Sequence, residues 1–435
     1  MHVNAAGAAV KHCIEQVFRC GLFAFVLAMG VAACDSDRTD IEPISTRSLE
    51  EQIGTRFSSL TAQSFQAPSV EKISLAFPSE ASAIWGAIGR DDDGHIYLGA
   101  STHAGENKTA YLARYNPNSG QISYQGDTVG QLKRLGLHLP GMGQNKLHSK
   151  FYQADDGFIY FASFDEQGES SDRNPAWGGH LWRKRPDATE WEHVTATKEA
   201  LIAVNVSGQY VYTLGYWDHV LYQYNMYTDK IATIVVGSVP GHISRNFLVD
   251  LRGHVYVPRV SLDSDNQLTA VLNEYDTRLS LVGAYPMPSY TAKKAAGHHG
   301  IVGYTSMKNG DIVFSTSDGG LYYLKTSLNG GTKLEYRGMM HPEGKAYIAS
   351  VFPMDGFSYL AAAARVPKQA EYDWVVYEVA SQISQTHPLN LSMKVKPLIY
   401  GTSTKDDTGN YYLVGQGGNR SRSRIPLLFR ISARQ

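Results

Sequence analysis

The stretch DDGFIYFAS, residues 155–163, joins a polar turn ending in glycine to a strand of alternating aromatic and small residues. Six similar stretches recur along the chain: DDGHIYLGA (92–100), VSGQYVYTLG (206–215), LRGHVYVPR (251–259), KNGDIVFST (308–316), MDGFSYLAA (354–362) and DTGNYYLVG (407–415). Their glycines, from Gly94 to Gly409, are spaced by 45 to 63 residues, which is typical of β-propeller blades of about four strands. The repeat therefore predicts an all-β, seven-bladed β-propeller.

The two ends of the repeat region predict how the ring closes. The seventh blade ends after a third strand in PLLFRISA, and the strand KISLAF at Lys72–Phe77 belongs to no repeat. We expect this N-terminal strand to complete the last blade, because closure removes exposed sheet edges. A β-sandwich array is the alternative architecture, and it leaves the N-terminal strand unexplained.

The composition agrees with a folded, strand-rich chain. Of 435 residues, 43% are hydrophobic and 19% are charged, and the 27 Tyr and 41 Gly favour short strands joined by turns. Lysine and arginine total 40 against 41 acidic residues, which excludes a generally basic nucleic-acid binder. We expect no nucleic-acid partner.

Residues 1–33 are predicted to be an export signal. Lys11 and Arg19 precede an apolar run, GLFAFVLAMGVAA, which is too short to span a bilayer comfortably. The run ends in VAAC, which resembles a bacterial lipobox with Cys34 as the lipidated residue. We expect an exported monomer attached to a bacterial membrane only through Cys34, on the outer surface or in the periplasm, with plain secretion as the alternative.

The rest of the chain divides into two parts. Residues 34–70 are polar and Ser/Thr-rich, and they predict a tether, whereas residues 71–435 form the propeller domain. Cys13 and Cys20 lie within the signal, so neither a disulfide nor a cysteine metal site is expected in the exported protein.

Strand direction predicts which side chains share one face of the propeller. Each repeat glycine lies between the innermost strand A and the next strand B, so the starts of A, the ends of B and the B–C loops gather on one face. Propeller ligands usually bind there, around the central channel. The residues nine positions before the glycines are Trp85, His148, Glu199, Ser244, Ile301, Tyr347 and Tyr400.

Further polar side chains are predicted on the same face. The long B–C insertion of the second blade leads to His180 in GGHLWR, and the segment GYWDH contributes Tyr216 and His219. The fourth blade supplies Arg245 and Arg259, although Arg259 could instead pair with Asp250. The final B–C loop, NRSRSR, carries three arginines that either contact substrate or form a solvated loop: Arg420, Arg422 and Arg424.

Histidines, tyrosines and arginines on one face suit β-elimination of a uronic acid glycoside. A cation must neutralise the carboxylate and stabilise the enolate-like transition state, and arginine binds a carboxylate through two parallel hydrogen bonds. A base such as histidine removes the C5 proton, and an acid protonates the departing O4. Aromatic faces pack against sugar rings, and we expect Trp85, His219, Tyr347, Tyr400 and Arg422 to bind substrate.

Three segments carry a resemblance to a known family: LHSKFYQADDGFIYFAS, GGHLWR and ISRNFLVDLRGHVYVPR. They resemble the seven-bladed ulvan lyases of polysaccharide lyase families 24 and 25, secreted bacterial enzymes that cleave sulfated rhamnose–uronic acid polysaccharide. The resemblance implies a catalytic histidine pair at His148 and His180 and a neutralising arginine at Arg245 or Arg259. It also implies a catalytic tyrosine, for which Tyr216 is preferred over Tyr347 and Tyr400.

Other functions stay open at the sequence level. The chemistry needs no cofactor, but His242, His298 and His299 could hold a structural zinc ion or another divalent cation. The alternative is that these histidines are hydrogen-bonded in loops. The protein could also be a non-catalytic propeller that binds glycans or proteins, or a metal-dependent lyase acting on pectic oligogalacturonides. A Ser-His-Asp hydrolase is not supported, since GxSxG does not occur.

Overall fold

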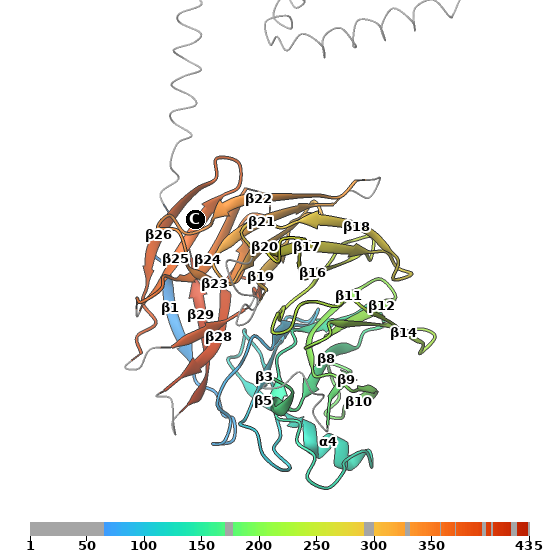
Figure 1. The fold of residues 1–435 in the computed structure, drawn as a ribbon. Helices are drawn as coiled ribbons and strands as arrows, with labels where there is room; N and C mark the ends of the chain where they lie inside the picture. Colours follow the sequence, from blue (N-terminus) through green and yellow to red (C-terminus); the bar gives the residue numbers. More distant parts are fainter. Residues whose placement is uncertain are drawn as a thin grey trace, which may run out of the picture. The chain divides into compact units, whose positions relative to one another are not determined.

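The computed structural model describes residues 65–169, 177–290, 300–326, 331–356, 358–369, 371–393, 397–401, 403–418 and 424–433. Nearly all of the regular secondary structure in these residues is β-strand, as the repeat predicts (Figure 1). The described helices are the seven-residue α4 (Thr128–Arg134) and the 3-10 turn η1 (Glu166–Glu169). Within the described residues, neither helix is long and apolar enough to cross a membrane.

Four sheets with four strands each follow one another along the middle of the chain. Their strands are antiparallel and neighbours in sequence are neighbours in the sheet. The first of these sheets contains β11 (Leu201–Ser207), β12 (Tyr210–Gly215), β13 (Val220–Asn225) and β14 (Ile231–Val235). The second contains β15 (Leu248–Val249), β16 (Val255–Leu262), β17 (Leu268–Tyr275) and β18 (Leu281–Pro286). The third contains β19 (Ile301–Ser306), β20 (Ile312–Thr316), β21 (Gly320–Lys325) and β22 (Lys333–Met339). The fourth contains β23 (Tyr347–Pro353), β24 (Tyr359–Arg365), β25 (Tyr372–Glu378) and β26 (Ile383–Leu389).

A fifth four-stranded sheet combines the two ends of the described chain. The strand β1 (Ser69–Ile73) pairs antiparallel with β29 (Ile425–Ser432), which continues to β28 (Tyr411–Gly417) and β27 (Leu398–Tyr400). The N-terminal strand lies at Ser69–Ile73 rather than at the predicted Lys72–Phe77. Leu75 and Phe77 lie beyond the ladder with β29, and they pack against the same hydrophobic core as Ile73 of β1. Phe65 is also buried, so the ordered fold begins before the predicted tether ends at residue 70.

The remaining strands form one sheet of nine strands, so the sheets do not match the predicted seven separate blades. Two antiparallel series join in this sheet through parallel pairing of β2 with β7 at Gly89–Phe151 and Arg90–Tyr152. The first series contains β2 (Ile88–Arg90), β3 (Ile96–Ala100), β4 (Tyr111–Tyr115) and β5 (Ile122–Asp127). The second contains β6 (Lys146–Leu147), β7 (Phe151–Gln153), β8 (Ile159–Phe164), β9 (Gly179–Lys184) and β10 (Glu192–Thr197).

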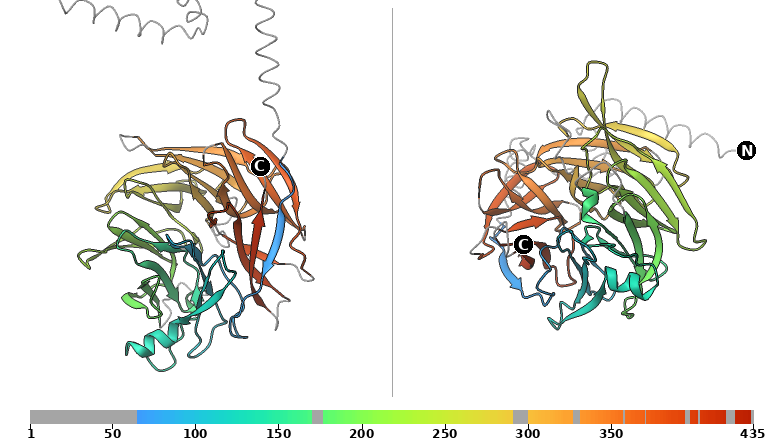
Figure 2. Two further views of the ribbon diagram at one scale, coloured as in Figure 1. Left: turned by 180° about the vertical axis from the view of Figure 1, so that it is seen from behind. Right: turned by 60° about the horizontal axis from the view of Figure 1, so that its bottom comes forward.

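Hydrophobic cores lie between consecutive sheets. One core joins β8, β9, β11, β12 and β13, and further cores join each later sheet to the next. The core of the first series also includes Tyr412, Val414 and Leu428, so β28 and β29 pack against the beginning of the fold. The two views in Figure 2 show the sheets following one another in sequence order about a common centre. The fold is therefore an all-β propeller.

The repeat glycines lie in turns between consecutive strands near the start of each series: Gly157 lies between β7 and β8, and each of the other six lies between the first and second strands. All seven have positive φ, between 51° at Gly208 and 92° at Gly356. Side chains with a Cβ rarely adopt this conformation, which explains why the polar turn ends in glycine. In three repeats an aspartate three residues earlier accepts a hydrogen bond from a tyrosine hydroxyl on the next strand. The pairs are Tyr97 with Asp91 (3.2 Å), Tyr256 with Asp250 (2.9 Å) and Tyr412 with Asp406 (2.8 Å).

Candidate functional site

Four residues predicted on one face lie together in the structure: Trp85, His148, Arg245 and Tyr400. We call them the central cluster. The Trp85 ring centroid is 4.4 Å from that of Tyr400 and 5.6 Å from that of His148. The guanidinium carbon of Arg245 is 5.4 Å from the Tyr400 ring centroid and 5.9 Å from that of Trp85. The cluster thus joins one cation and one imidazole to two aromatic faces.

Three residues of the central cluster, Trp85, His148 and Arg245, line a small cavity. The cavity contains about 270 Å³ of empty space, part of it open to solvent, with room inside for little more than one water molecule. Residues of six innermost segments line it: Trp85, Gly86, His148, Ile202, Arg245, Asn246, Val302 and Gly401. These segments are far apart in sequence, so only the converging inner strands bring the residues together.

A second cation lies beside the cluster. The Lys146 Nζ atom is 4.8 Å from the Trp85 ring centroid and forms an ion pair of 2.9 Å with Glu166. Burial raises the pKa of Tyr400 well above its ordinary value, and the Arg245 charge acts against this rise. Tyr400 is therefore a neutral phenol at physiological pH, able to donate a hydrogen bond. An anionic sugar group at the cavity would meet positive charge and a hydroxyl donor.

Lys150 lies two residues beyond His148 and belongs to a second buried group. Its Nζ atom is 3.7 Å from the Tyr304 ring centroid and 3.4 Å from the hydroxyl oxygen of Ser403. The Tyr304 hydroxyl is hydrogen-bonded to the Tyr152 hydroxyl and accepts a hydrogen bond of 3.2 Å from Asn205. Burial lowers the pKa of Lys150 to about 7. This lysine was not predicted from the sequence, because its partners come from three distant segments.

His180, the predicted catalytic partner of His148, lies elsewhere. It is on β9, where its Nδ1 atom is hydrogen-bonded to His193 Nε2 at 2.9 Å and its ring stacks on Trp182 at 5.8 Å. Residues two apart in a strand share a face, so His180 points with Trp182 into the core rather than toward the cluster. Burial first, and then His193, lower the pKa of His180 to about 3. His180 is therefore a neutral packing residue, and the predicted histidine pair is not formed.

Tyr216 is close to the cluster without being part of it. Its ring centroid is 6.0 Å from that of Phe164, which in turn contacts the His148 ring edge-on at 4.9 Å. Tyr216 also packs against Trp217 at 4.9 Å and is buried. Tyr216 and His148 thus both contact the Phe164 ring.

The two candidate arginines differ in position. Arg245 lines the cavity, whereas Arg259 is exposed on β16. The suggested pairing of Arg259 with Asp250 does not occur, because Asp250 pairs with Arg252 at 2.7 Å. Among the other predicted residues, Tyr347 is half-buried at the start of β23 and lines a different pocket. Arg420 and Arg422 lie outside the described residues, and Arg424 is half-buried just before β29.

The histidines predicted to bind metal are only partly described. His298 and His299 lie outside the described residues. Both ring nitrogens of His242 are hydrogen-bonded, Nδ1 to Ser238 Oγ at 2.7 Å and Nε2 to the Tyr290 hydroxyl at 2.8 Å. His219 is fully buried with its ring 5.0 Å from that of His242, and burial lowers its pKa to about 4. This geometry fits the alternative of hydrogen-bonded loop histidines.

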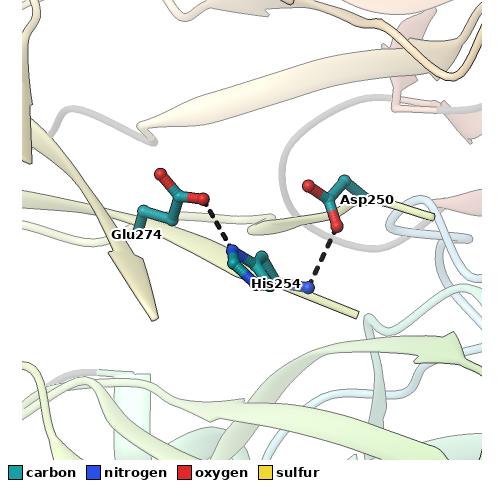
Figure 3. Close-up of side chains that lie close together, drawn as sticks. All are labelled: Asp250, His254 and Glu274. Carbon is teal, nitrogen blue, oxygen red and sulfur yellow. Dashed lines mark hydrogen bonds and ion pairs between the residues drawn. The ribbon is translucent and has the colours of Figure 1, made fainter. Parts of the chain in front are cut away.

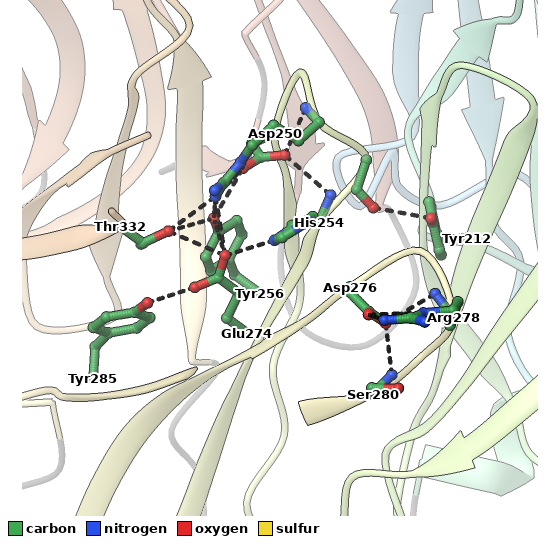
Figure 4. A network of polar contacts seen from close by, with 12 residues as sticks. Tyr212, Asp250, His254, Tyr256, Glu274, Asp276, Arg278, Ser280, Tyr285 and Thr332 are labelled. Carbon is green, nitrogen blue, oxygen red and sulfur yellow. Dashed lines mark hydrogen bonds and ion pairs between the residues drawn. The ribbon is translucent and has the colours of Figure 1, made fainter. Parts of the chain in front are cut away.

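A different group, Asp250, His254 and Glu274, has the side-chain types of a metal site (Figure 3). His254 Nδ1 is 2.7 Å from a Glu274 carboxylate oxygen. Arg252, however, contacts both carboxylates, at 2.7 Å and 3.0 Å. The Tyr256 hydroxyl also donates to Asp250, and the network extends to Tyr285 and Thr332 (Figure 4). The guanidinium occupies the position that a cation would need, so we interpret this network as structural.

The fold and the central cluster define a β-propeller protein with a basic, aromatic cavity at the inner strands. No protein-family model matches the chain, and no curated protein matches it. Among solved structures, it is similar to the β-propeller domain of Cps50 (Swd1) from Myceliophteria thermophila, with 11% identity and a TM-score of 0.51, covering 82% of this chain and 99% of that one. A protein of unknown function from Dyadobacter fermentans matches with 12% identity and a TM-score of 0.48, covering 86% and 100%. The similarity to the Cps50 domain shows the fold alone.

Proposed function

We propose that this protein is a polysaccharide lyase, a carbon–oxygen lyase that cleaves an acidic, sulfated uronic-acid polysaccharide of the ulvan type by β-elimination. The observation that carries the proposal is the central cluster, in which Arg245 and His148 line one cavity with Trp85, and Tyr400 packs against Trp85. The proposal includes export, with a lipid anchor at Cys34 as the attachment to the membrane.

In the proposed mechanism Arg245 binds the uronate carboxylate, because a guanidinium stays charged and forms paired hydrogen bonds. Its charge stabilises the enolate-like transition state. His148 removes the C5 proton, the electron pair forms the C4–C5 double bond, and the C4–O4 bond breaks. Tyr400 donates its proton to O4, and proton exchange with solvent then restores both residues. Tyr400 is preferred over Tyr216 because it lies beside Arg245.

We also propose that the propeller has seven blades. The nine-stranded sheet contains two antiparallel series, each with its own repeat glycine, Gly94 or Gly157. Counting these series separately adds two blades to the five four-stranded sheets. In this interpretation β1 closes the ring through its pairing with β29, and the core shared by β3 and β28 supports the closure.

The small size of the cavity favours a second candidate function, that of a non-catalytic propeller that binds glycan. It has room for little more than one water molecule, and Trp85 and Tyr400 pack closely at 4.4 Å. A non-catalytic propeller that binds glycan across its face would need no deeper cavity. A lyase instead requires the uronate carboxylate to reach Arg245, so Trp85 must move aside when substrate binds.

The test is ultraviolet absorbance of unsaturated uronate ends during incubation of the exported form with a panel of polyuronates that includes ulvan. The lyase predicts a rise with ulvan that falls by at least about 100-fold in His148→Ala and that Arg245→Gln also abolishes. His180→Phe is the matched control, since it replaces a histidine of the same sheet outside the cluster. A flat trace on every substrate with retained glycan binding would contradict the lyase and support the binding protein.

A further inference from the structure

A second pocket lies on the same face as the central cluster, between the third and fourth four-stranded sheets. Its volume is about 650 Å³ of empty space, part of it open to solvent. The residues that line it are Ser317, Asp318, Lys345, Ala346, Tyr347, Arg365, Pro367, Lys368 and Gln369. They come from the turn between β20 and β21, the start of β23 and the end of β24, so strand direction places them on the face that carries the cluster. We call this the Arg365 pocket.

The Arg365 pocket carries an excess of positive charge. Three cationic side chains line it against one carboxylate, that of Asp318. Asp318 pairs with Lys345 at 2.9 Å, which leaves Arg365 and Lys368 without an ion pair among the residues that the structure describes. Arg365 is half-buried, so its charge is less screened than that of an exposed lysine. Positive charge in a pocket attracts an anionic ligand group.

The Arg365 pocket and the central cluster are neighbours. The guanidinium carbon of Arg365 is 5.8 Å from the Tyr372 ring centroid. The Tyr372 hydroxyl accepts a hydrogen bond of 2.9 Å from the backbone N–H of Ile399, the residue before Tyr400. Both Arg245 and Arg365 act on the pKa of Tyr400, each opposing the rise that burial causes. Arg245 therefore lies beside Tyr400, and Arg365 is connected to the same segment through Tyr372.

We propose that the Arg365 pocket binds a sulfate ester on the sugar next to the uronate that Arg245 holds. A sulfate ester presents three acceptor oxygens, which a guanidinium fork and an ammonium can contact together. Lys368 supplies the ammonium, and the half-buried Tyr347 supplies a hydroxyl and an aromatic face at the pocket edge. This inference rests on the proposed function for the identity of the polymer, but not on the elimination step.

The experiment measures binding rather than turnover. Affinity for ulvan and for chemically desulfated ulvan is compared by calorimetry, with all variants made in the His148→Ala background. Arg365→Gln should weaken binding of ulvan about tenfold, which is the value of one charge-assisted hydrogen bond of about 1.4 kcal/mol. Binding of desulfated ulvan should not change. Arg278→Gln, which removes an exposed arginine on a distant turn, is the control and should bind both polymers as the parent does.

Other binding results would overturn the inference. Equal weakening on both polymers would mean that the pocket contacts a second carboxylate or the sugar itself. Unchanged binding, or no binding of ulvan by the parent, would mean that the pocket takes no sulfate. Thermal melting of Arg365→Gln guards against misfolding, and Arg365→Lys should retain part of the affinity because it keeps the charge but not the fork. Sulfate-dependent binding without any ultraviolet signal from the wild type would refute the lyase and leave the pocket assignment standing.

Discussion

Replacing Lys150 with methionine tests how the charge at the centre of the propeller affects stability. Lys150 is buried against the face of Tyr304, and its pKa falls from 10.5 to about 7 because burial disfavours the ammonium. Methionine is unbranched and of similar length, so it can fill the same space without a charge. The variant isolates the protonation of one side chain while the surrounding residues stay the same.

The magnitude follows from proton linkage. An unfolded lysine binds a proton up to pH 10.5, whereas the folded one releases it near pH 7, so the unfolded state holds more protons between these values. The free energy of unfolding of the wild type should therefore rise with pH in this window relative to Lys150→Met. Between about pH 7 and pH 9.5, the free energy of unfolding of the wild type should rise by about 3 kcal/mol relative to that of Lys150→Met. Attraction of the ammonium to the Tyr304 ring, worth up to about 2 kcal/mol, holds the pKa higher and reduces the gain to about 1 kcal/mol.

The assay is urea unfolding of both proteins at about pH 7, 8 and 9.5, with the difference in unfolding free energy plotted against pH. Taking the difference cancels the titration of the tyrosines, which both proteins share. The variant should be the more stable protein at pH 7, and its advantage should shrink toward pH 9.5. A difference that stays constant, or that grows with pH, would refute the argument and indicate that the ammonium is solvated or has an anionic partner.

Three further predictions concern other parts of the fold. Burial lowers the pKa of His180 from 6.5 to about 3, so between these pH values the unfolded state binds a proton that the folded state does not. In urea unfolding, the free energy of unfolding of the wild type should therefore fall by about 2 kcal/mol relative to that of His180→Phe between pH 7 and pH 5. A difference that does not change with pH would contradict this prediction. Gly409→Ala should lower the free energy of unfolding by about 1 kcal/mol through backbone conformation alone, since φ is 85° and an added Cβ meets no atom within 4 Å. Gly409→Asn should lower the melting temperature less than Gly409→Ala does, because asparagine tolerates positive φ better. A chelator should leave the melting temperature unchanged, while Asp250→Asn should lower stability by about 2 kcal/mol, because Arg252 loses one of its two carboxylate partners and keeps Glu274. A lower melting temperature with chelator alone would indicate a bound metal.

Much of the candidate site could be predicted from the sequence, because the distance of a residue from its repeat glycine gives its position within the blade. Counting back from each glycine placed Trp85, His148 and Tyr400 at the starts of inner strands, and the structure brings these three residues together. The same counting could not choose between Arg245 and Arg259, because both were assigned to the same face. In the structure Arg259 is exposed on β16, whereas Arg245 lines the cavity. Whether a side chain is exposed depends on how neighbouring sheets pack against it.

Where the structure places a predicted residue away from the central cluster, strand register is the reason. His180 follows a loop toward the predicted face, but its place in β9 turns the side chain toward Trp182 and His193. One residue of register decides which face a strand residue occupies, and no local signal in GGHLWR reveals it.

The sequence by itself determined the class of fold and the turns. Glycines with positive φ, and the aspartate–tyrosine pairs around them, are set within a few residues of chain. Only the tertiary structure decided which distant side chains meet: Arg245 beside Tyr400, Lys150 beneath the face of Tyr304, and Arg365 across Tyr372 from the cluster. The physical reason is that turns depend on local backbone geometry, whereas the centre of a propeller is built from inner strands whose positions depend on how whole sheets pack.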